Sequence, residues 1–248
     1  MKPTRKSPTR LPAKSHVLAF GAHPDDIEFG CGGVIAREIE SGRKAHLVVC
    51  SRGEAGTNGT PEQRIAEAQK AAEILGATVE FIEFDGDAHL EVRATHALRL
   101  AEIIRRVRPA IILAPSLVQN QHPDHWRLGQ LVRDAARLAR YGGLGELKGT
   151  ASHRIGQLFF YALSPDSEPG NITPVLIDVS EDGVLSTWAR AMRAHASQMK
   201  TRDYAGLQLA RAKVHGSRCG VEAAIPLFPN DPLVFDSLET ISRGARHF

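Results

Sequence analysis

The strongest constraint on the fold is a short apolar run at residues 17–20 that leads through a polar turn into a helical pattern. Four consecutive apolar residues that end at a turn are typical of a buried strand. Apolar residues then recur at the spacing of one helix face, at Ile27, Cys31, Val34, Ile35 and Ile39. A buried strand followed directly by a helix predicts a parallel sheet that is covered by helices.

The same alternation continues along the chain. Strands are expected at residues 45–50, 79–84 and 110–114, with helices from residue 61, over residues 97–107 and through residues 128–132. This pattern predicts an α/β fold of Rossmann-like type, a doubly wound and mainly parallel sheet with helices on both faces. Further strands are expected at 158–163 and 175–179, and further helices at 185–199 and 204–214. The last thirty residues contain three prolines and little periodicity.

Length and charge bound the class of protein. A chain of 248 residues fits one α/β domain, which is expected over residues 16–248. Residues 1–15 carry five basic side chains, no acidic ones and many Pro, Ser and Thr, so they are expected to form a disordered tail. Outside this tail, 26 basic residues stand against 28 acidic ones. A nearly neutral body argues against a nucleic-acid partner.

Hydropathy and cysteine content exclude other classes. No apolar stretch approaches the ~18 residues that a membrane helix needs, so no membrane partner is expected. The three cysteines are scattered and odd in number, which favours a reducing, cytoplasmic location over a disulfide framework. The sequence has no CxxC pair, so a zinc ion would be held by nitrogen and oxygen ligands.

Polar residues that suit a metal ion follow two of the expected strands. They are His23, Asp25 and Asp26 after the first strand, and His122, Asp124 and His125 after the strand at residues 110–114. Ligand sites of open α/β sheets form at the carboxyl ends of the strands, where both groups lie. Hydrolytic zinc takes three protein ligands, and His23, Asp26 and His125 would supply two imidazoles and one carboxylate. The same set suits ferrous iron, so both Zn²⁺ and Fe²⁺ stay open.

The remaining polar residues suit the other tasks of such a site. Asp25 adjoins a ligand and is placed to accept the proton of an activated water as general base. His122 is a candidate to stabilise a tetrahedral oxyanion and then to donate a proton to a leaving amine. Asp124 is a candidate to orient one of the imidazoles. The competing structural explanation is that Asp25 or Asp26 caps the helix that follows.

Three segments resemble one known family. GAHPDD at residues 21–26, SRGEAGTNG at 51–59 and HPDH at 122–125 are similar to motifs of the PIG-L/LmbE-like zinc-dependent N-acetylglucosamine deacetylases. The bacillithiol-biosynthesis deacetylase branch is the most similar one. The resemblance covers roughly residues 16–220 and implies an LmbE-like fold. It also implies zinc ligands at His23, Asp26 and His125, a general base at Asp25 and oxyanion stabilisation by His122.

The resemblance further implies a substrate and an assembly. The implied reaction removes the acetyl group from an N-acetylglucosaminyl substrate, such as the GlcNAc-malate of bacillithiol biosynthesis, and the implied oligomer is a trimer or hexamer. In the glycine-rich loop, Arg52 and Glu54 match family residues that contact the sugar, and Asn58 is a further candidate contact. A salt bridge between Arg52 and Glu54 that pins the loop is the competing explanation.

Near its end the chain departs from the family pattern. Relatives often have Tyr and Glu near the pocket where this chain has Ala223 and Ile225. Two alternatives therefore stay open. One is an amidase of glucosaminyl thiol conjugates, which would prefer a bulky acyl group, and the other is a non-catalytic metal- and sugar-binding protein on the same fold. His195 matches a family segment but is expected on a helix surface.

Overall fold

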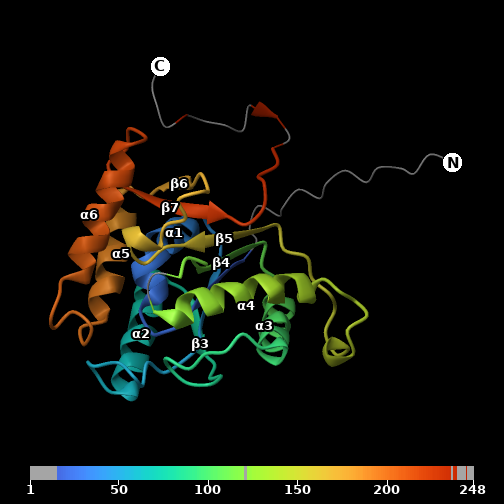
Figure 1. Cartoon of the computed structure of the whole chain (residues 1–248). Helices are drawn as coiled ribbons and strands as arrows, with labels where there is room; N and C mark the ends of the chain where they lie inside the picture. The colour runs from blue at the N-terminus through green and yellow to red at the C-terminus, as the bar shows by residue number, and fades with distance from the viewer. Residues whose placement is uncertain (1–15, 120–121, 236, 239–243, 245–248) are drawn as a thin grey trace.

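The computed structural model describes residues 16–119, 122–235, 237–238 and 244, and its seven strands form a sheet in the order β3-β2-β1-β4-β5-β7-β6 (Figure 1). The strands are β1 (Val17–Gly21), β2 (Ala45–Val49), β3 (Thr78–Phe81), β4 (Ile111–Pro115), β5 (Gln157–Tyr161), β6 (Val175–Asp178) and β7 (Ala224–Pro229). Strands β1 to β5 pair in parallel, whereas β7 is antiparallel to both β5 and β6. The basic tail expected over residues 1–15 lies outside the described residues.

Helices cover both faces of the sheet (Figure 1). They are α1 (Asp26–Glu40), α2 (Pro61–Leu75), α3 (Ala94–Val107), α4 (Pro123–Ala139), α5 (Asp182–Ala194) and α6 (Tyr204–Ser217), with the short 3-10 helices η1 (Gly145–Leu147) and η2 (Pro165–Ser167). Helices α1, α2, α5 and α6 share one apolar core, and α3 and α4 share the other. The expected doubly wound, mainly parallel α/β fold is therefore confirmed. None of the described helices is long and apolar enough to span a bilayer.

Strand β1 shows why the sequence is apolar without interruption at this point. Val17 and Ala19 belong to the core under α1, whereas Leu18 and Phe20 belong to the core under α3 and α4. Successive side chains of a strand point to opposite faces, so a strand covered on both sides is apolar at every position. All five residues of β1 are buried.

The sheet order changes direction between β1 and β4. From β1 the chain runs outward through β2 to β3, and it then returns through α3 to pair β4 with the other side of β1. β1 pairs with β4 over residues 17–19 only, although it pairs with β2 over its whole length. Ligands of doubly wound sheets bind in the crevice at this switch point. The polar loops after β1 and β4 border that crevice.

The structure differs from the sequence expectations mainly near the C-terminus. Strand β7 was not expected because it contains Pro226 and Pro229, which lack the N–H that a ladder uses. Its pairing with β5 involves only residues 159–160, and the longer ladder with β6 holds it in the sheet. Helix α5 ends at Ala194 rather than at residue 199, because the chain leaves the helical conformation at His195, with φ −81° and ψ 56°.

The close packing of α1 on the sheet predicts a cost at one glycine. Gly30 faces the ring of Tyr161, which is fully buried and donates its hydroxyl to the Phe20 carbonyl (2.7 Å). A Cβ at residue 30 would overlap with ring carbons. Gly30→Ala should therefore lower the free energy of unfolding by about 1–3 kcal/mol. Urea denaturation measures this, with Gly149→Ala as control because no atom lies within 4 Å of a Cβ there. Equal stability of the two variants would contradict this packing.

Candidate active site

The turn between β1 and α1 is held by a carboxylate. Asp26 is the first residue of α1, and its Oδ2 accepts the backbone N–H groups of Ala22 (2.8 Å) and His23 (2.9 Å). Asp25 occupies the N-cap position, but its side chain makes no capping hydrogen bond, and its φ of 127° is rare outside glycine. Helix capping by Asp25 therefore does not explain this turn.

His125 approaches the turn from the neighbouring loop. It lies in the first turn of α4, directly after the loop that follows β4. Its Nε2 is 3.2 Å from Asp26 Oδ1 and 3.3 Å from His23 Nδ1. His23 Nδ1 is in turn 3.5 Å from Asp26 Oδ2. The structure thus brings together the three side chains that the sequence singles out as metal ligands.

The separations of these atoms fit a metal ion. At Zn–N distances of about 2.0–2.1 Å, tetrahedral ligand atoms lie about 3.3 Å apart. The contacts found are 3.2 Å from His125 Nε2 to Asp26 Oδ1, 3.3 Å from His125 Nε2 to His23 Nδ1, and 3.5 Å from His23 Nδ1 to the other Asp26 oxygen, Oδ2. The carboxylates around His23, Asp26 foremost, raise its pKa well above the usual value although burial lowers it. A buried, negatively charged pocket with two imidazoles and one carboxylate therefore suits a divalent cation.

Asp25 lies beside this triad and is connected to α2. Its Oδ2 is 3.4 Å from Nη2 of Arg64, a buried residue of α2. Arg64 also donates to the carbonyls of Gly53 (2.8 Å) and Pro24 (3.1 Å). Burial and then the charge of Asp26 raise the pKa of Asp25 to about 6, although Arg64 lowers it. Arg64 was missed in the sequence because nothing there distinguishes a buried helix arginine from an exposed one.

His122 precedes α4 and faces the same pocket. Its Nδ1 accepts the backbone N–H of Asp124 (3.3 Å). A nitrogen that accepts cannot carry the proton, so the proton of a neutral ring is on Nε2. Burial and then the charge of His23 lower the pKa of His122. The ring therefore offers an Nε2–H donor to the pocket.

Asp124 is turned toward His23 more closely than toward His122. Its Oδ2 accepts the backbone N–H of Ala88 at 2.7 Å. The same oxygen lies 3.6 Å from His23 Nε2 and 3.9 Å from His122 Nδ1. The Asp124 carboxylate is thus in a position to orient an imidazole, and the nearer imidazole is that of His23.

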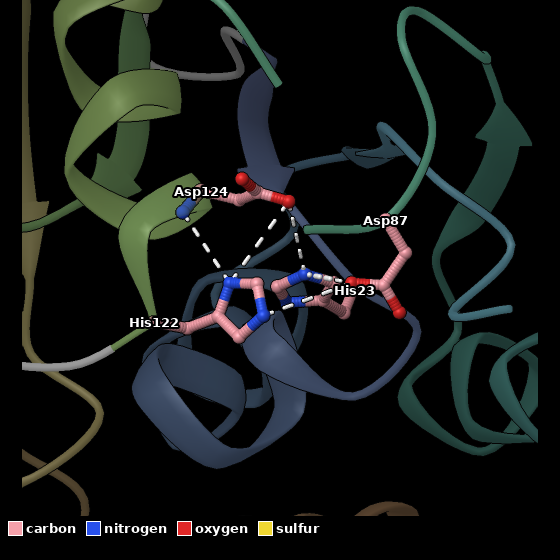
Figure 2. Close-up of side chains that lie close together, drawn as sticks. All are labelled: His23, Asp87, His122 and Asp124. Carbon is pink, nitrogen blue, oxygen red and sulfur yellow. Dashed lines mark hydrogen bonds and ion pairs between the residues drawn. The ribbon is translucent and has the colours of Figure 1, made fainter. Parts of the chain in front are cut away.

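A further carboxylate, Asp87, enters the pocket from the loop after β3 (Figure 2). Its Oδ1 is 3.0 Å from His23 Nε2, and its side chain is 4% exposed. Its ligand atoms and those of His23, His122 and Asp124 all lie within 4.8 Å of one another. Asp87 was not among the residues singled out in the sequence. The available signal was the segment Asp85-Gly86-Asp87, which follows a strand at the same sheet edge as the other polar loops.

The three candidate substrate contacts lie in the loop between β2 and α2. The Arg52 guanidinium contacts Glu62 (2.7 Å) rather than Glu54. The Glu54 carboxylate instead accepts the backbone N–H groups of Arg52 (3.1 Å) and Asp87 (2.7 Å). The Asn58 carbonyl accepts Nε2 of Gln198 (2.7 Å). These contacts fix the loop against the loop after β3 and the segment after α5.

Three residues near the C-terminus are buried in the structure. The expectation of a helix-surface position for His195 is wrong: its ring is fully buried, with Nε2 3.4 Å from Oε2 of Glu28. Helix α5 ends directly before this residue, so His195 does not continue the helix surface. Ala223 and Ile225, where relatives often have Tyr and Glu, belong to the core that includes Trp188.

Fold and site together define an α/β protein with a candidate metal centre at the switch point of its sheet. The sequence model of the PIG-L family, described as GlcNAc-PI de-N-acetylase, matches residues 18–136. Diacetylchitobiose deacetylase of Thermococcus kodakarensis is 30% identical over 196 residues, which cover 73% of this chain and 69% of that protein. The chain belongs to the PIG-L family, as the three sequence motifs indicate.

Other similar proteins widen the range of named activities. The 4-oxalmesaconate hydratase of Pseudomonas putida is 35% identical over 144 residues, or 53% of this chain and 55% of the hydratase. The chain thus spans about half the length of that relative. The conserved protein TT1542 from Thermus thermophilus has a similar structure, with a TM-score of 0.79 and 31% identity over 89% of this chain and 97% of that one.

Proposed function

We propose that this protein is a metal-dependent hydrolase that removes the acetyl group from an N-acetylated amino sugar. One observation carries the proposal: next to Asp25, the side chains of His23, Asp26 and His125 make pairwise contacts of 3.2–3.5 Å, and their ligand atoms all lie within 4.8 Å of one another. His23, Asp26 and His125 would hold the ion. When bound, zinc polarises a carbonyl and lowers the pKa of water toward neutrality.

Asp25 is the proposed general base. Its half-buried carboxylate takes a proton from the attacking water, and the contact with Arg64 keeps that carboxylate in place. A base transfers protons most effectively when its pKa lies near the working pH, and burial and the charge of Asp26 raise the pKa of Asp25 in that direction. The proton balance closes when the amide C–N bond breaks, because Asp25 can return this proton to the leaving amine. Asp25 thus takes over the donation that the sequence favours for His122, because the lowered pKa of His122 favours a neutral ring.

His122 is the proposed donor to the oxyanion. Its Nδ1 accepts the Asp124 N–H, so Nε2–H is free to donate to the carbonyl oxygen as negative charge develops on it. Asp124 helps to fix this arrangement, since its backbone holds the His122 ring and its carboxylate approaches His23.

The charges of the site favour a neutral, hydroxyl-rich group next to the scissile amide. Its carboxylates are those of Asp25, Asp26, Asp87 and Asp124. Sugar hydroxyls can donate hydrogen bonds to carboxylates. The nearby guanidinium groups of Arg52 and Arg64 already contact Glu62 and Asp25. Within this class, GlcNAc-malate is the substrate that the family resemblance implies, with its malate bound outside the ring of carboxylates.

A hydratase is the second candidate, and the 35% identity to the Pseudomonas putida hydratase favours it. Addition of water to a carbon–carbon double bond also needs an activated water, for which the same residues would serve. The Thermococcus kodakarensis deacetylase, however, matches 73% of this chain, against 53% for the hydratase. Deacetylation is therefore the first choice.

Removal and return of the metal test the proposal. Chelator-treated protein should release no acetate from simple N-acetylglucosaminides, and one equivalent of zinc per chain should restore release. A parallel anaerobic sample with Fe²⁺ identifies the more active metal. Metal-loaded protein that releases no acetate would refute the deacetylase. Hydration of 4-oxalmesaconate, cleavage of bulkier acyl conjugates, or sugar binding without turnover would then indicate the hydratase, the amidase or the binding protein.

We also propose a cytoplasmic location and a homo-oligomeric state. Cys31, Cys50 and Cys219 are free thiols, and two of them are buried, which is compatible with a reducing compartment. The family resemblance implies a trimer or hexamer. Light scattering on the purified full chain measures the molecular mass and so tests this assembly. A monomer at micromolar concentration would contradict that assembly.

A further inference from the structure

The two ring nitrogens of His23 face different partners. Nδ1 faces His125 and Asp26, the other proposed metal ligands. Nε2 lies 3.0 Å from Oδ1 of Asp87, on the other side of the ring (Figure 2). The ring is thus held between the proposed metal position and a buried carboxylate that the mechanism above does not use.

Asp87 is itself fixed from two directions. Its Oδ2 accepts the backbone N–H of Ala55 at 3.1 Å, and its own N–H donates to Glu54 Oε1 at 2.7 Å. Its two carboxylate oxygens therefore have separate tasks, one toward the glycine-rich loop and one toward His23. Asp124 is a more distant partner for His23, because its Oδ2 is 3.6 Å away and already accepts the Ala88 N–H.

We propose that Asp87 is the positioning residue of the metal centre, which holds His23 with its proton on Nε2 and its Nδ1 lone pair toward the ion. Histidines that bind metals almost always give their other ring N–H to a carboxylate, carbonyl or water, which fixes the tautomer and the ring orientation. The inference rests on the proposed metal centre. It adds that the loop after β3, which carries Asp87, controls the affinity of that centre for the metal ion.

The same four side chains have a competing explanation as a second metal site. His23, Asp87, His122 and Asp124 lie close enough together to share an ion. However, His23 would then have to bind both ions and lose its last ring proton, which makes joint occupation unfavourable. The contact distances of 3.0 to 3.9 Å are also more scattered than those of the His23–Asp26–His125 triad. Positioning is therefore the better supported role.

Asp87→Asn is the sharpest test because it keeps the size of the side chain. Asparagine has one acceptor oxygen, so either Ala55 or His23 loses its partner. Zinc affinity, measured by competition with a chelator and without substrate, should fall about 10-fold in Asp87→Asn and about 100-fold in Asp87→Ala. The melting temperature of the metal-free protein should change little in Asp87→Asn, and the visible spectrum of the Co²⁺-loaded variant should show altered coordination.

Asp85→Asn is the matched control on the same loop. Asp85 binds the Glu91 N–H and contacts His96 and Arg93, so it supports the loop without touching His23. An equal loss of zinc affinity in both Asn variants would mean that the loop, not the Asp87 carboxylate, matters. A wild-type chain that binds two zinc ions, reduced to one by Asp87→Asn, would assign the residue to a second site. Either result overturns the proposal.

This experiment is independent of the reaction. If the metal-loaded protein releases no acetate but Asp87→Asn binds zinc less tightly, the proposed deacetylation fails and the positioning role stands. If deacetylation is found and zinc affinity is unchanged in Asp87→Asn, only the positioning role fails.

Discussion

Replacing Asp25 by asparagine is expected to lower kcat by about 10²–10⁴-fold, the contribution of a positioned general base. Asparagine keeps the size of the side chain and tolerates the φ of 127° at this residue better than most residues do, but it cannot take up a proton. The proposed ligands are other side chains, so zinc content should stay at the wild-type value. Acetate release at saturating substrate and zinc analysis of the same sample check both parts.

Two controls make this result specific. Asp182→Asn changes an exposed carboxylate in the first turn of α5 and should alter neither quantity. Because Arg64 loses a charged partner in Asp25→Asn, the melting temperature shows whether lower activity reflects unfolding. Loss of zinc in proportion to activity would make Asp25 a ligand, and water activation would have to be assigned to another residue.

Replacing His122 by alanine is expected to lower kcat by about 10²–10³-fold, as removal of one oxyanion donor does. The donor acts on charge that develops only in the transition state, so KM should change little. Zinc content should also be preserved, because His122 is outside the His23–Asp26–His125 triad. Steady-state kinetics with N-acetylglucosaminides measure kcat and KM separately.

His89→Ala is the control for this variant. His89 is exposed on the loop that carries Asp87, and its loss should leave kcat unchanged. A His122→Ala variant with normal kcat and raised KM would show that the ring binds substrate rather than the oxyanion. A variant depleted of zinc would place His122 among the ligands.

Much of the fold and the core of the candidate site were accessible from sequence because local pattern and topology agree there. β1 and β4 are short apolar runs, and a parallel sheet brings the loops that follow them to one edge. The correct topology was therefore enough to predict that His23, Asp26 and His125 lie close together. The same reasoning placed Asp25 and His122 beside them.

The rest depends on tertiary packing that local pattern does not encode. Pro226 and Pro229 hid β7, which is held by its ladder with β6. Arg64 is buried only because the glycine-rich loop and the Asp25 turn both pack onto α2. His195 is buried because α5 stops one residue before it. Asp87 is a single carboxylate in a turn-like segment, and only its distance to His23 shows that it belongs to the site.

The backbone conformation of Asp25 also bears on how this protein can evolve. A non-glycine residue at φ 127° costs on the order of 1–3 kcal/mol, a large share of the about 5–15 kcal/mol that keeps a domain folded. Glycine would remove most of that cost and leave the His23–Asp26–His125 triad intact. A lineage selected only to bind metal or sugar gains stability from this exchange, whereas a lineage selected for turnover loses its base. Residue 25 is therefore a position at which genome sequences can separate active descendants from those that have kept only the scaffold.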